Sequence, residues 1–78
     1  MSVLNDFRRE IWMQAERSGS VDLDRLFELL DEASIDEAIA LLAPAVGSEQ
    51  VEPLQAAWAL ATDDEAAGWL AWDEALGR

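Results

Sequence analysis

Carboxylates are the main reactive side chains of this sequence. Its 78 residues include 17 aspartates and glutamates but no histidine, cysteine or tyrosine, and all five basic residues are arginines. The chain therefore lacks the imidazole, thiol and amine side chains that serve enzymes as general bases, nucleophiles and Schiff-base formers. It also lacks the usual nitrogen and sulfur ligands of zinc. These absences predict a protein that is not an enzyme and binds neither a cofactor nor a metal ion.

Carboxylates can catalyse reactions by themselves when two of them face a cleft and their environments separate their pKa values. Many acidic pairs exist here, but a domain of this size rarely encloses a substrate pocket. We therefore interpret the acidic clusters as candidate contacts for a partner protein. The candidate acidic residues are Asp31, Glu32, Asp36, Glu37, Asp63, Asp64, Glu65, Asp73 and Glu74.

Trp72 is the aromatic candidate for such a contact. On a helix, Trp69 and Trp72 are about 60° apart, so they share one broad face. Alanine-rich neighbours and Gly68 favour close packing of this face against another helix, which predicts that the tryptophans lie in the core. Trp72 is followed by Asp73 and Glu74, and aromatic side chains ringed by charge are common binding anchors. It is therefore the tryptophan that we would place at the rim of the core.

The net charge of −12 is unevenly distributed along the chain. Residues 1–25 carry four arginines against five acids, whereas residues 26–78 carry twelve acids against Arg78 alone. Such a surface repels nucleic acid and anionic membranes, because binding to either depends on cations that neutralise phosphates. It would attract a basic protein surface. The alternative is that the charge only keeps a small alanine-rich protein soluble.

The sequence DEASIDE, residues 31–37, places four acids around one interhelical junction. Asp36 and Glu37 fall in the first turn of a predicted helix, where the positive end of the helix dipole stabilises them. Asp31 and Glu32 fall near the end of the preceding helix, where the dipole opposes them by a few tenths of a kcal/mol each. This cluster is either a solvated face or a contact for a partner.

Hydroxyl and acidic residues mark the predicted helix starts. Ser34 and Thr62 are each followed three residues later by a glutamate, which is the spacing of a capping box. Ser48 and either Ser20 or Asp22 are further candidate N-caps.

Glycines and prolines mark the predicted helix ends and turns. Gly19 and Gly47 precede two of the helix starts, where a left-handed residue would close the preceding helix. Pro44 should end the third helix and leave residues 44–47 as a turn. Pro53 fits the first turn of the fourth helix, which then begins nearer residue 52 than residue 48.

Apolar residues recur at helical spacing in five segments, and no segment alternates with the period of a strand. These patterns predict an all-α fold, a compact array of four or five short helices that forms one domain over residues 1–78. No apolar run approaches the roughly 20 residues of a bilayer span, and the N-terminus lacks a secretory signal, so we expect a soluble cytoplasmic protein. The predicted stripes are Leu4, Phe7, Ile11 and Ala15; Leu23, Leu26, Phe27 and Leu30; Ile35, Ala38, Ile39 and Leu42; Val51, Leu54, Trp58 and Ala61; and Ala66, Trp69, Leu70 and Leu76.

The sequence VDLDRLFELLDEASID, residues 21–36, resembles the stretch that leads to the phosphopantetheine serine of acyl carrier proteins. That family is also small, acidic and helical, and the resemblance implies a carrier protein modified at Ser34. In the family a glycine comes shortly before an Asp-Ser-Leu triplet. Here Ala33 and Ile35 flank Ser34 and no glycine precedes it, so a helix cap is the alternative role for this serine.

These observations predict a non-catalytic interaction domain that docks an acidic surface onto a basic partner protein without binding nucleic acid or membrane itself. In composition the chain is similar to small acidic proteins, many of them phage-encoded, that occupy the nucleic-acid sites of other proteins. DNA mimics and some anti-CRISPR inhibitors belong to that class. The alternative is a structural subunit that forms a homo-oligomer, or docks onto an apolar groove, through its apolar and tryptophan-bearing faces.

Overall fold

This computed structural model describes residues 2–78. The apolar residues at helical spacing lie in six helices, and the described range contains no strand. The predicted all-α fold is therefore confirmed. A one-turn helix stands where the sequence predicted only a turn after Pro44. The helices are α1 (Val3–Ser18), α2 (Leu23–Asp31), α3 (Ile35–Leu41), α4 (Ala43–Val46), α5 (Ser48–Asp63) and α6 (Glu65–Leu76).

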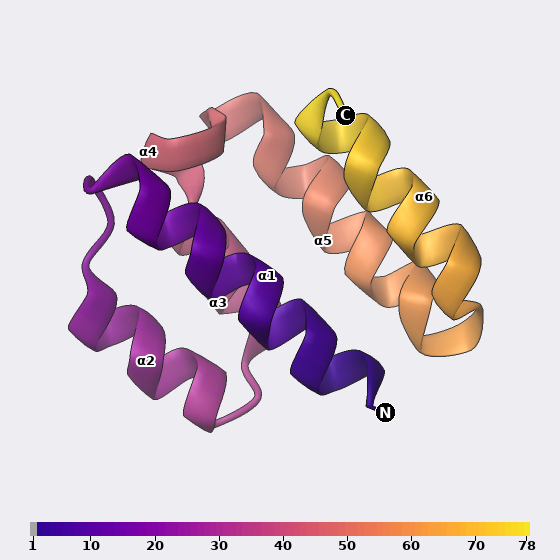
Figure 1. The fold of residues 1–78 in the computed structure, drawn as a ribbon, viewed down its shortest axis with the longest axis horizontal. Coiled ribbons are helices and arrows are strands. Elements are labelled where there is room, and N and C mark those ends of the chain that lie inside the picture. The colour runs from indigo at the N-terminus through magenta and orange to yellow at the C-terminus, as the bar shows by residue number, and fades with distance from the viewer. Residues whose placement is uncertain (1) are drawn as a thin grey trace.

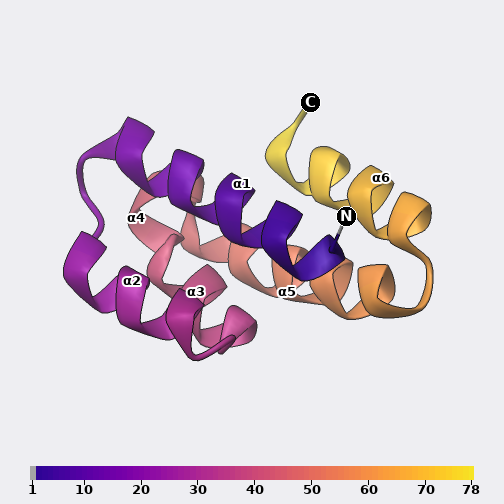
Figure 2. The same ribbon diagram turned by 60° about the horizontal axis from the view of Figure 1, so that its bottom comes forward.

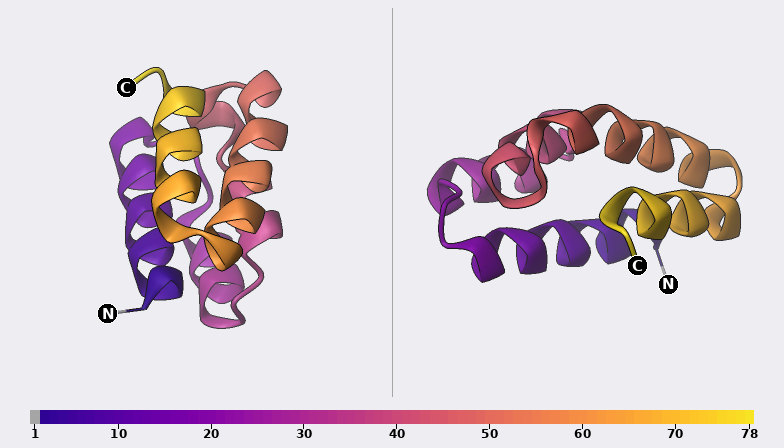
Figure 3. Two further views of the ribbon diagram at one scale, coloured as in Figure 1. Left: turned by 90° about the vertical axis from the view of Figure 1, so that its right-hand side faces the viewer. Right: turned by 90° about the horizontal axis from the view of Figure 1, so that it is seen from above.

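The helices pack in two layers. Seen from above, α1 and α6 form one layer and α3, α4 and α5 form the other (Figure 3, right). The helices α5 and α6 form an antiparallel hairpin, and α2 lies on the opposite side of α1 from α6 (Figures 1 and 2). The described chain measures 30 × 25 × 17 Å along its principal axes. No helix within residues 2–78 is both long enough and apolar enough to cross a membrane.

Phe7 of α1 is the centre of the aromatic core. Its ring stacks on Trp69 at 4.2 Å between centroids and meets Trp58 and Trp72 edge-on at 5.1 and 5.2 Å. Such pairs stabilise a fold beyond the area that they bury, so Phe7 joins α1 to the α5–α6 hairpin. The fully or nearly fully buried residues are Phe7, Ile11, Ala15, Leu26, Leu29, Leu30, Ile35, Ala38, Ile39, Leu42, Leu54, Ala57, Ala61 and Trp72.

Two of the predicted helix ends, at Gly19 and Asp22, are confirmed, whereas those at Ser34 and Gly47 are confirmed only in position. Gly19 ends α1 with φ 66°, a left-handed conformation that glycine adopts without strain. The N-cap of α2 is Asp22, whose side chain accepts a hydrogen bond from the Arg25 backbone N–H at 3.2 Å. Ser34 occupies the N-cap position of α3, but its side chain makes no capping hydrogen bond. Gly47 has φ 96° and ψ 137°, so it separates α4 from α5 without closing α4 in the left-handed helical region.

The predicted boundaries of the last two helices are wrong. The helix α5 begins at Ser48 and continues through Pro53, which was expected near its start. Thr62 lies inside α5, where its hydroxyl donates to the Ala59 carbonyl oxygen at 2.7 Å. The N-cap of α6 is instead Asp64, whose side chain accepts a hydrogen bond from the Ala67 N–H at 3.2 Å.

Two predicted stripes contain exposed side chains. In α2, Leu23 and Phe27 are 36% and 63% exposed, because the helix turns Leu26, Leu29 and Leu30 toward the core instead. In α6, Leu70 is 67% exposed. Each of these helices carries more apolar residues than one buried face can hold, so part of the set faces outward. By contrast, all four residues of the third stripe are buried, as predicted.

Candidate functional site

The four acids of residues 31–37 lie in and beside the turn between α2 and α3, and all four are exposed. Asp31 ends α2, Glu32 follows it, and Asp36 and Glu37 lie in the first turn of α3. The turn itself is fixed by backbone hydrogen bonds: the Ser34 N–H donates to the Leu29 carbonyl oxygen and the Ala33 N–H to that of Leu30. These two bonds form a Schellman motif, with Ala33 in the left-handed conformation at φ 60°. The start of α3 is further tied to α5, because Gln55 Nε2 donates to the Asp36 carbonyl oxygen at 2.9 Å. A rigid turn therefore presents these carboxylates.

The second acidic cluster, Asp63, Asp64 and Glu65, forms the turn between α5 and α6, and all three side chains are exposed. The α2–α3 and α5–α6 turns lie toward the same end of the molecule, whereas α4 and the C-terminus lie at the other end (Figure 1; Figure 3, left). We call this region the acidic end; its residues are Asp31, Glu32, Asp36, Glu37, Asp63, Asp64 and Glu65.

None of the ion pairs within residues 2–78 involves a carboxylate of the acidic end. Those pairs join Arg25 to Glu28 at 3.2 Å, and Arg78 to Glu10 at 2.8 Å and to Asp73 at 2.7 Å. No group of three or more acids in the described range is arranged to hold a metal ion. The acidic end thus presents its carboxylates separately and without cationic partners.

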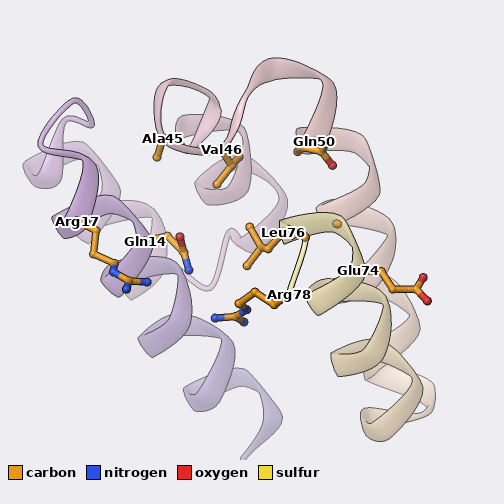
Figure 4. Close-up of a pocket in the computed structure, with 10 residues that line it drawn as sticks. Gln14, Arg17, Ala45, Val46, Gln50, Glu74, Leu76 and Arg78 are labelled. Carbon is orange, nitrogen blue, oxygen red and sulfur yellow. The ribbon is translucent and has the colours of Figure 1, made fainter.

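The other two acidic candidates lie away from this end, on α6. Asp73 is half-buried and bonded to Arg78, so an internal cation already compensates its charge. Partial burial lowers the pKa of Arg78, but hydrogen bonds and attraction to Asp73 and Glu10 raise that pKa by more, so the guanidinium stays charged. Glu74 is exposed and its side chain points away from α1 (Figure 4). Of this pair, only Glu74 presents an uncompensated charge.

The expectation that Trp72 lies at the rim of the core is wrong. Its side chain is 0% exposed, and its indole Nε1 donates to Glu10 Oε1 at 3.4 Å. Trp72 follows Gly68 by one helical turn, and Gly68 is buried against Ala61 of α5, so this face of α6 points inward. The acids at 73 and 74 lie about 100° and 200° further round the helix and do not indicate the direction of the indole. Trp72 is therefore a core residue, and Trp69, which is partly buried, is the more exposed of the two.

A polar cavity of about 530 Å³ opens between the end of α1, α4 and the end of α6. Figure 4 shows the side chains of Gln14, Arg17 and Arg78 at this cavity. Glu74 is the acidic side chain among its lining residues.

Sequence reasoning missed a second hollow, an apolar groove of about 360 Å³ between α1 and α2. We call it the α1–α2 groove; it is lined by Arg8, Arg9, Trp12, Phe27, Leu30 and Asp31. The signal available in the sequence was the number of apolar residues in α2, which is larger than one buried face of a helix can hold. The pattern could not reveal which of its members face outward.

No protein-family model, no curated protein and no solved structure matches this chain. The segment that resembles acyl carrier proteins is residues 21–36. Within it, residues 23–31 are helical and Ser34 is half-buried at the start of α3.

Proposed function

We propose that this chain is a non-catalytic interaction domain that docks its acidic end onto a basic surface of a partner protein. The observation that carries the proposal is the set of uncompensated carboxylates on two fixed turns at one end of the fold. Of the 17 acids, all but Asp6, Glu10 and Asp73 are exposed. Among the exposed acids, only Glu28 forms an ion pair within the described range.

A basic surface that ordinarily holds nucleic acid is the partner chemistry that fits this arrangement best. Carboxylates on two turns with defined backbone hydrogen bonds present separated negative charges, as phosphates do along a nucleic-acid backbone, and arginine recognises both groups. The domain would then act as a nucleic-acid mimic that inhibits its partner in the cytoplasm. Long-range attraction between the two charged surfaces would accelerate their encounter, and salt would weaken it.

The test neutralises the α2–α3 turn without changing its shape. The variant combines Asp31→Asn, Glu32→Gln, Asp36→Asn and Glu37→Gln. A matched control neutralises four exposed acids elsewhere: Glu16→Gln, Asp24→Asn, Glu49→Gln and Glu52→Gln. Both variants have the same net charge, so a difference between them reports the position of the carboxylates rather than their number.

Each protein is used to capture partners from a lysate of the native host, and the dissociation constant of the captured partner is then measured by calorimetry. Exposed charge pairs contribute about 0.2–1 kcal/mol each, so we expect the turn variant to bind at least about ten-fold more weakly than the control. Raising the salt concentration should weaken binding of the unmodified chain steeply. Equal affinities for both variants, or affinity independent of salt, would contradict the proposal.

A further inference from the structure

The α1–α2 groove leaves an aromatic side chain in solvent. Phe27 is 63% exposed, and its ring meets that of Trp12 edge-on at 6.4 Å between centroids. Leu23, one turn earlier on α2, is also exposed, at 36%. Aromatic side chains in such a position contribute strongly to association when a partner covers them.

The walls of the groove carry charges of opposite sign. On the α1 wall, Arg8 and Arg9 form no ion pair with any carboxylate of residues 2–78, although the chain has 17 acids. The Nη1 group of Arg8 donates to Asn5 Oδ1 at 3.2 Å, and its buried Nε has no hydrogen-bond partner in the described range. On the α2 wall, Asp31 is exposed and equally without an ion pair. The groove thus suits an occupant with an apolar anchor and a carboxylate next to it.

The outer face of α2 has that chemistry. Leu23 and Phe27 are four residues apart and therefore lie on one side of the helix. Asp24 comes one residue after Leu23, and Asp31 comes four residues after Phe27. The same surface contains both the groove and the side chains that would fill it. Self-complementarity of this kind is the property of an isologous, two-fold interface.

We propose that two copies of this chain associate through their α1–α2 grooves about a two-fold axis. Phe27 of each copy enters the groove of the other, and Asp31 of each copy faces Arg8 and Arg9 of the other. This self-association is separate from docking by the acidic end. Because Asp31 belongs to both surfaces, self-association is measured on the purified chain with no partner present.

The experiment is sedimentation velocity over a range from about 10 μM to about 1 mM, which detects dissociation constants typical of weak dimers. We expect the unmodified chain to form a dimer and no larger species. Phe27→Ala should lower the association constant at least about ten-fold. Its circular dichroism should stay unchanged because the side chain is exposed. The matched control is Leu70→Ala, which removes an equally exposed leucine from α6 and should leave the association constant unchanged.

A charge exchange tests the two-fold geometry. Arg9→Glu and Asp31→Arg should each weaken the dimer, and the double variant, which has the original net charge, should regain it. Asp31→Arg is the sharper single change, because it reduces the net negative charge and would strengthen association if only general repulsion mattered. The proposal would be overturned if the unmodified chain were a monomer at every concentration or formed larger oligomers. It would also be overturned if Leu70→Ala weakened association as much as Phe27→Ala, or if the double variant stayed monomeric.

Discussion

At the scale of single residues, Gly68 sets the distance between α5 and α6. It is buried, and a Cβ atom at this position would overlap the Cβ, Cα and backbone nitrogen of Ala61. Backbone atoms cannot move aside as the end of a flexible side chain can. The close approach of the two helices therefore depends on the absence of a side chain here.

We predict that Gly68→Ala destabilises the fold. Alanine gains about 1 kcal/mol of helix propensity over glycine. Overpacking of a core contact costs about 1–3 kcal/mol or more, and here both helix backbones must separate, so the overlap should outweigh the propensity gain. Urea denaturation followed by tryptophan fluorescence measures the free energy of unfolding. The exposed Ala66→Gly calibrates propensity alone in the same helix, and a Gly68→Ala protein as stable as the unmodified chain would show that the helices are not in close contact.

The two C-terminal tryptophans show how far residue patterns carry. The helical spacing predicted that Trp69 and Trp72 share a face, and both do pack in or against the core. It placed the wrong one of the two at the rim, because Asp73 and Glu74 follow Trp72 in the sequence but lie on other sides of the helix. The position of Gly68 against Ala61 resolves this, and it depends on a contact between two helices rather than on either sequence alone.

At the scale of elements, the α2–α3 turn contains a residue that is poorly matched to its backbone. Ala33 has φ 60° and occupies the C′ position of a Schellman motif, where glycine is strongly preferred. A left-handed conformation costs an L-residue with a Cβ about 1–2 kcal/mol. The two backbone hydrogen bonds of the motif and the packing of α2 against α3 hold Ala33 in this conformation against its own preference.

We therefore predict that Ala33→Gly stabilises the protein by up to about 1 kcal/mol, because the relief of strain exceeds the larger entropy that glycine loses on folding. Thermal unfolding monitored by circular dichroism measures the effect. Ala40→Gly, an exposed position inside α3, is the control and should destabilise the protein by about the same amount. A lower melting temperature for Ala33→Gly would show that position 33 is not left-handed.

The helix boundaries show where local rules are sufficient. Gly19 was predicted, and Asp22 was one of two candidate caps, because a left-handed glycine and a cap hydrogen bond are local features. Pro53 was not, because a proline inside a helix is tolerated only when other contacts hold the helix. Here the buried Leu54 and the hydrogen bond from Gln55 to α3 hold the helix beside Pro53. Proline has no N–H for the carbonyl of Glu49, and both residues are exposed, so water can reach that carbonyl.

At the scale of the whole molecule, the acidic end and the α1–α2 groove are two surfaces that share Asp31. The carboxylates of the acidic end lack cationic partners, whereas the exposed aromatic side chain Phe27 lies beside the free arginines of α1. The sequence predicted the charge imbalance, since it is a sum over residues. It did not predict the groove, because that requires knowing which face of α2 turns away from α3.

The charges that the two associations bring together predict that salt acts on them in opposite directions. Docking of the acidic end onto a basic partner joins opposite charges, so its affinity should fall as salt rises from about 0.05 to about 0.5 M. Self-association joins two chains that each have a net charge of −12, so screening of their mutual repulsion should strengthen the dimer over the same range. Sedimentation of the purified chain and calorimetry with its basic partner measure the two trends. If the dimer instead weakened as salt rises, the ion pairs between Arg9 and Asp31 would dominate the salt dependence of its association constant.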